Sequence, residues 1–93
     1  MLFRSDAPTP DDATVQAAVR ALAQSRGTAS SLCPSEVARA LDADQWRRLM
    51  PVVRQAVAAL ARAGEVEVLQ RGRVQSPDDP WRGPIRIRLV GGL

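Results

Sequence analysis

The chain contains no histidine, tyrosine or lysine, and its 93 residues include only one cysteine. The usual general bases and Schiff-base nucleophiles are therefore missing, and we expect no enzymatic activity. One cysteine without histidine cannot build a zinc centre, and no glycine-rich phosphate loop follows a predicted strand. We therefore predict neither a metal nor a cofactor. Cys33, the lone cysteine, cannot form an internal disulfide.

Long hydrophobic runs are also missing. No stretch approaches the roughly 18 apolar residues of a membrane span. Residues 1–10 lack the basic start and apolar centre of a signal peptide, which predicts a cytoplasmic protein. The length suits a single domain, which we place at residues 9–90, with a frayed terminus at 1–8 and a short tail at 91–93.

Positive charge is present only as arginine, and it is unevenly distributed. Residues 1–45 carry four arginines against six acids, a balance of −2, whereas residues 46–93 carry nine arginines against four acids, a balance of +5. A GC-rich genome would also favour arginine over lysine, so the position of the arginines is more informative than their identity. A basic half of this kind attracts phosphate backbones through counterion release.

Three helices are predicted from apolar spacing and from helix-start signals. The first begins near Thr9-Pro10, with Thr9 as its cap, and ends at Gly27. Residues 29–32 follow as a short extended segment, and Pro34 lies in the first turn of a second, short helix. Its core positions are Val37, Ala38 and Leu41.

The third helix has the most regular apolar stripe in the chain. Asp42 or Asp44 is predicted to cap it, and Pro51 is predicted to kink it or split it into two pieces. The residues of the stripe follow one another in steps of mostly three and four: Trp46, Leu49, Met50, Val53, Val57 and Leu60.

Two alternating segments follow, at residues 65–69 and 85–89. Alternation places one set of side chains on the buried face of a two-stranded ribbon: Val66, Val68, Ile85, Ile87 and Leu89. The charged set comprises Glu65 and Glu67 on one strand and Arg86 and Arg88 on the other, and we expect cross-strand ion pairs between them. The order helix, short strand, helix, helix, strand, wing, strand predicts a winged helix, an α+β fold of three to four helices with a small antiparallel sheet.

Three segments together resemble a bacterial family of small winged-helix domains that is catalogued as a domain of unknown function. They are the Cys-Pro-Ser-Glu-Val-Ala run from Cys33, the Trp-x-x-Leu-Met-Pro run from Trp46, and the Gly-Pro-Ile-Arg-Ile-Arg-Leu run from Gly83. The resemblance covers roughly residues 11–89. It supports the predicted fold and implies no catalytic or binding residue.

Two groups of side chains are candidates for binding double-stranded DNA. The first lies on the exposed side of the third helix and comprises Arg47, Arg48, Arg54, Gln45 and Gln55. In helix-turn-helix proteins the start of this helix meets the base edges, and arginine grips phosphate or guanine through two donors. The second lies in the wing, residues 70–84, and comprises Arg71, Arg73 and Arg82. A transcriptional regulator is one role that would fit such a protein.

Other interpretations of the same residues stay open. Both arginine groups could be ordinary solvated surface, and the adjacent acids Asp78 and Asp79 would repel DNA if they faced it. Trp46 falls on the apolar stripe and is expected in the core. Trp81 lies in the polar wing, where it could either pack against the sheet or anchor a protein partner or a second copy of the chain. The alternative function is therefore a protein-interaction or dimerisation module that does not bind nucleic acid. Cys33 is expected to be inert, although its place before a helix would also suit a redox-sensing thiol.

Overall fold

The computed structural model describes residues 9–91, so the predicted frayed terminus at 1–8 lies outside the described residues. Residues 9–91 form three helices and a four-stranded antiparallel sheet, which confirms the α+β class. The elements are α1 (Asp12–Arg26), β1 (Ser31–Leu32), α2 (Pro34–Leu41), α3 (Trp46–Arg62), β2 (Val66–Gln70), β3 (Arg73–Gln75) and β4 (Arg86–Leu89). This is the order expected of a winged helix, with β3 as an additional strand inside the predicted wing.

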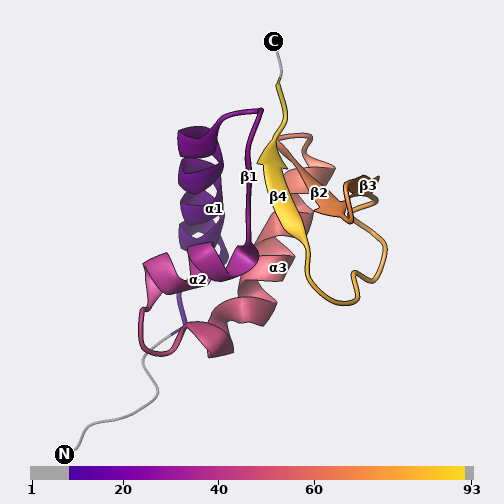
Figure 1. The fold of residues 1–93 in the computed structure, drawn as a ribbon. Coiled ribbons are helices and arrows are strands. Elements are labelled where there is room, and N and C mark those ends of the chain that lie inside the picture. Colours follow the sequence, from indigo (N-terminus) through magenta and orange to yellow (C-terminus); the bar gives the residue numbers. More distant parts are fainter. Residues whose placement is uncertain (1–8, 92–93) are drawn as a thin grey trace, which may run out of the picture.

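The sheet has the strand order β1-β4-β2-β3, and every neighbouring pair is antiparallel. Figure 1 shows α2 crossing the lower end of the bundle and β3 at the edge of the sheet farthest from α1. β2 lies one residue later than the predicted segment and runs to Gln70, whereas β4 starts one residue later than predicted, at Arg86, and ends at Leu89 as predicted. Residues 70–84, predicted as one loop, instead contain a tight turn, the strand β3 and a second loop.

One hydrophobic core joins the helices to one face of the sheet. The stripe of α3 is buried at Leu49, Val53, Val57 and Leu60, and Trp46 and Met50 lie half-buried against it. The predicted sheet face is also confirmed, since Val66, Val68, Ile85 and Ile87 are at most 2% exposed and Leu89 is half-buried. Alternation and helical spacing therefore identified the core correctly.

The residues that cap α1 and α3 differ from the predicted ones. Asp11, not Thr9, caps α1, because its carboxylate accepts a hydrogen bond from the Thr14 amide at 2.9 Å. This contact lowers the pKa of Asp11 through hydrogen bonds from Thr14 to the ionised carboxylate. The Asp42 carboxylate accepts from the amides of Asp44 and Gln45 at 3.0 Å, which organises the turn before α3. Gln45 is the cap residue of α3 and makes no capping bond through its side chain.

Pro51 lies inside α3 without splitting it, so of the two predicted effects, a kink or a split, the split does not occur. The helix continues from Trp46 to Arg62. Proline lacks the amide that would bond to the carbonyl four residues earlier, that of Arg47. Pro51 is exposed, so water can solvate the carbonyl left without its helical partner.

No helix in residues 9–91 is both long and apolar enough to cross a membrane.

Candidate nucleic-acid interface

The tip of the β2–β3 hairpin projects arginine side chains. Its two-residue turn consists of Arg71 and Gly72, between the paired residues Gln70 and Arg73. Both turn residues have positive φ, +52° at Arg71 and +79° at Gly72, as the turns that suit the twist of a hairpin require. Glycine, asparagine and aspartate are preferred at such positions. An arginine there carries a conformational cost in return for a cation at the tip.

The loop between β3 and β4 is held in place by side chains on both of its sides. The Gln70 amide donates to the carbonyl of Arg82 and, at 3.4 Å, to that of Pro84. The indole N–H of Trp81 donates to the carbonyl of Ser76 at 2.9 Å, and its ring is half-buried against the core. Trp81 therefore packs against the core and shapes the loop, and its role as an anchor for a partner stays a prediction.

Helix α3 anchors the same loop. Arg54 donates from Nη2 to the carbonyls of Trp81 and Gly83, at 3.0 and 3.1 Å. Near the end of the helix, Arg62 Nε donates to Asp78 Oδ1 at 2.8 Å. The loop therefore lies along the second half of α3, and Arg54, a predicted DNA contact, is placed to position the loop. Asp78, one of the two acids expected to repel DNA, is paired with a cation, and the other, Asp79, is exposed.

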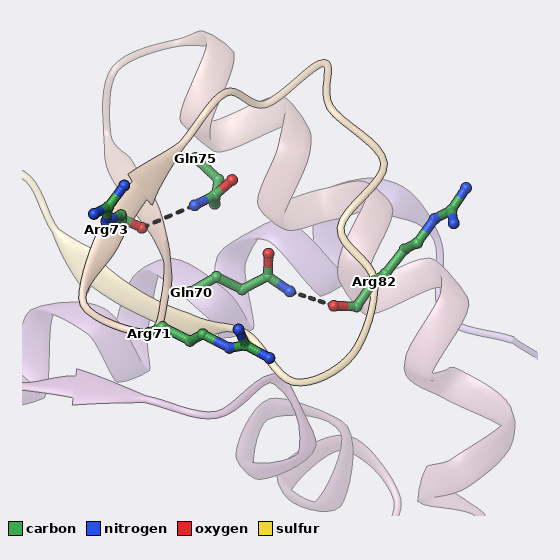
Figure 2. A pocket seen from close by; sticks show the side chains of 5 residues that line it. All are labelled: Gln70, Arg71, Arg73, Gln75 and Arg82. Carbon is green, nitrogen blue, oxygen red and sulfur yellow. Dashed lines mark hydrogen bonds between the residues drawn. The ribbon is translucent and has the colours of Figure 1, made fainter.

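Three predicted arginines and two glutamines line a hollow of about 540 Å³ between the hairpin and the loop: Gln70, Arg71, Arg73, Gln75 and Arg82. A neighbouring hollow of about 460 Å³ shares Gln70, Arg71 and Arg82. Figure 2 shows Arg71 extending from the turn and Arg82 pointing outward from the loop, with Gln70 between them. We call these five residues the wing hollow. Its lining carries guanidinium and amide groups and no carboxylate, which suits an anion.

The start of α3 presents a second set of cations. Arg47 Cζ lies 4.4 Å from the centroid of the Trp46 ring, within range of a cation–π contact. Arg47 and Arg54 are seven residues apart, so they share one face of α3 and lie about 10 Å apart along its axis. Because Arg54 holds the loop, Arg47 branches from the same side of α3 as the loop, and its guanidinium lies over the Trp46 ring.

The other predicted residues of α3 are less aligned with the wing. Arg48 lies about a quarter-turn from Arg47 and has its Nη1 3.4 Å from Thr9 Oγ1. Gln45 and Gln55 are exposed. The structure thus gathers Arg71, Arg73 and Arg82 at the wing and places Arg47 on the same side of α3.

The cross-strand ion pairs were half correctly predicted. Arg88 lies opposite Glu67 and donates to its carboxylate from Nε at 2.8 Å. Glu65 instead accepts from Arg20 of α1 at 2.6 Å, and this hydrogen bond lowers the pKa of Glu65. Within residues 9–91, Arg86 makes no cross-strand ion pair, because it lies opposite Leu69 in the register.

Arg86 is directed toward β1 and the start of α2. It donates to Ser31 Oγ at 2.8 Å, to the Ser31 carbonyl at 2.9 Å and to Cys33 Sγ at 3.0 Å. Cys33 is half-buried at the N-cap of α2, where its amide donates to Glu36 at 2.9 Å. That hydrogen bond is the main reason that the pKa of Glu36 is lowered. Residues 9–91 contain no cluster of three or more side chains with metal-ligand chemistry.

Sequence reasoning missed three residues of the candidate interface. Gln70 and Gln75 line the wing hollow, and Arg39 of α2 lies with its Cζ 4.4 Å from the centroid of the Trp46 ring. The two glutamines gave no signal because polar residues are ordinary in a predicted loop. Arg39 is exposed on a helix, and its proximity to Trp46 depends on how α2 packs against α3.

The fold and the site define a small α+β protein with a basic wing. The chain belongs to the family described as "Protein of unknown function (DUF3253)", whose model matches residues 12–90. This confirms the resemblance seen in the sequence, and the family's description names no activity. Among curated proteins, none matches the chain.

Proposed function

We propose that this protein binds double-stranded DNA, with the wing arginines on the phosphate backbone and the first turns of α3 at the edge of a groove. The observation that carries the proposal is the contrast between two kinds of arginine in the basic half of the chain. Arg62 and Arg88 are paired with carboxylates. Within residues 9–91, Arg71, Arg73 and Arg82 donate to no carboxylate and are exposed.

The distribution of these cations favours an extended polyanion. Figure 2 shows the wing arginines spread around the hollow and not pointing at one centre, as contacts to successive phosphates require. Arg47 adds a cation on the same side of α3. If these four arginines each neutralise one phosphate, the slope of log affinity against log salt is about −3.6. Raising the salt from about 50 to 200 mM then weakens binding by about two orders of magnitude.

The loop limits how α3 can approach DNA. Arg54 and Arg62 hold the segment 76–84 against the second half of the helix. Only the first turns of α3, with the exposed Gln45 beside Arg47, are left to approach a groove. Phosphate contacts therefore dominate the proposed complex, and sequence selection comes from few residues.

Fluorescence anisotropy with a labelled mixed-sequence duplex tests the proposal. Single Arg71→Gln, Arg73→Gln and Arg82→Gln variants should each flatten the salt slope by about 0.9, and the triple variant should lose most of its affinity. Arg20→Gln is the matched control, since it removes the same charge from α1, where Arg20 is paired with Glu65. Wild-type anisotropy that stays flat at low salt, or equal losses in the control, would refute the proposal. A duplex RNA of the same sequence shows whether DNA is preferred.

A second candidate function, self-association, is favoured by the outer edge of the sheet. β3 has a strand neighbour on one side only among residues 9–91, and Val74 on it is 59% exposed. An unpaired edge with an exposed apolar residue can add a strand from another chain. Sedimentation equilibrium distinguishes the cases: a dimer that Val74→Lys dissociates supports self-association, and a monomer at all concentrations excludes it.

A further inference from the structure

A cluster of three side chains lies at the corner between α2 and α3, beyond the wing. Trp46, the first residue of α3, is half-buried against the core. Arg39 of α2 and Arg47 of α3 each place their Cζ 4.4 Å from the centroid of its ring. Both arginines are exposed. We call this cluster the tryptophan–arginine stack.

The stack fixes two cations without using their hydrogen-bond donors. A guanidinium that lies over an aromatic face is attracted through its charge, and its five N–H groups remain available around its edge. Arg39 and Arg47 donate to no carboxylate or carbonyl within residues 9–91. Arg54 is the contrast on the same helix, because its Nη2 is already hydrogen-bonded to two carbonyls of the loop. The two arginines of the stack are therefore held in place while their N–H groups remain available for hydrogen bonds.

Positioned donors of this kind match phosphate oxygens. The guanidinium fork makes two parallel hydrogen bonds to a phosphate, and a side chain held by stacking loses less rotamer entropy on binding than a free one. Carboxylates occur in the preceding turn, where Asp42 is occupied by the amides of Asp44 and Gln45. Asp44 is exposed. Neither acid is paired with Arg39 or Arg47 in the structure.

We infer that the tryptophan–arginine stack is a second phosphate-binding site for the nucleic-acid backbone, with Arg39 as a binding residue and Trp46 as a positioning residue. The inference rests on the proposed DNA binding and extends its footprint from the wing to α2. Arg47 lies about 10 Å along the helix axis from Arg54, which holds the wing loop. The stack and the residue that holds the wing loop are thus separated along one side of α3, as two contacts on an extended backbone would be.

Two substitutions test separately the charge of the stack and the positioning of its arginines. Arg39→Gln removes one cation, so at about 0.1 M salt it should weaken duplex binding about fivefold to tenfold and flatten the salt slope by about 0.9. Trp46→Leu keeps both cations and removes the aromatic face, so it should weaken binding about twofold to fivefold with an unchanged slope. Trp46→Phe should recover part of that loss. Thermal melting of each variant confirms that it is folded, and Arg20→Gln is again the charge control.

The possible outcomes distinguish failure of this inference from failure of the proposed DNA binding. If the wing variants lose affinity and Arg39→Gln matches Arg20→Gln, the stack binds no phosphate and the proposed function stands. If the wild type binds no duplex at any salt concentration, both fail. If a poly-glutamate peptide binds in a manner that depends on Arg39 and the duplex does not, the stack recognises an acidic protein and the inference is overturned.

Discussion

Substituting Arg71 by asparagine should stabilise the protein while weakening its binding to DNA. Arg71 occupies the left-handed region at φ +52°, in a turn that the pairing of Gln70 with Arg73 fixes. A non-glycine residue there costs about 1 kcal/mol or more, and asparagine tolerates the region best among residues with a Cβ. We therefore expect Arg71→Asn to raise the free energy of unfolding by about 0.5–1 kcal/mol.

For a domain of this size, that gain corresponds to a rise in Tm of about 2–8 °C, measurable by circular dichroism. Two controls isolate the cause. Arg71→Ala removes the charge and keeps a Cβ in the left-handed region, so its Tm should stay near that of the wild type. Gly72→Ala should lower stability by about 1 kcal/mol. Its φ is +79° and no atom lies within 4 Å of the added methyl group, so that cost would be conformational.

The same variant tests the binding role of the tip. Arg71→Asn should flatten the salt slope for duplex binding by about 0.9, because one phosphate contact is lost. A variant that is more stable and binds more weakly identifies Arg71 as a residue kept for its charge. An unchanged or lower Tm would refute the assigned strain, and unchanged binding would remove Arg71 from the interface.

Three further outcomes are expected. Arg54→Gln should release the loop, giving faster amide exchange in residues 76–84 with little change in α1; equal exchange in both proteins would show that the loop is held otherwise. Glu65→Gln should lower the Tm at pH 7, because the lowered pKa of Glu65 marks a carboxylate stabilised by Arg20 when ionised. That stabilisation is lost as the pH falls from the ordinary glutamate pKa of about 4.5 through the lowered pKa of Glu65, so the melting temperatures of the two proteins should converge in acid, and a constant gap would contradict this. Pro51→Ala should restore one helical hydrogen bond and raise stability by about 1–2 kcal/mol in urea denaturation, whereas a loss would mean that Pro51 has a packing role.

Much of the fold could be predicted because its signals are local. The apolar stripe of α3 and the alternation in β2 and β4 report which side chains face the core. Gly27 ends α1 as expected, with φ +75°. The cap of α1 was misplaced because Thr9 and Asp11 are both good caps two residues apart, and only the geometry shows that Asp11 reaches the Thr14 amide. β3 was missed because its three residues, Arg73–Gln75, are too few for their alternation to predict a strand, and they pair only because the turn returns them to β2.

The candidate site was predicted less completely, because the state of an arginine depends on distant partners. Arg54 acts on the loop through carbonyls 27 and 29 residues away, and no local pattern distinguishes it from Arg47. Arg39 and Trp46 meet only through the packing of α2 against α3. Arg20 and Glu65 are 45 residues apart, and their ion pair takes up a carboxylate that was expected to pair across the strands.

The amino-acid sequence alone determined the α+β class, the core, and the concentration of positive charge in the second half of the chain. Those properties follow from periodicity and composition, which can be read from residues that are close together in the sequence. Only the tertiary structure decided which arginines are paired and which are exposed in the wing hollow and the tryptophan–arginine stack. The reason is that a long cationic side chain is neutralised by whichever acceptor the folded chain brings within about 3 Å, and that acceptor is often remote in sequence.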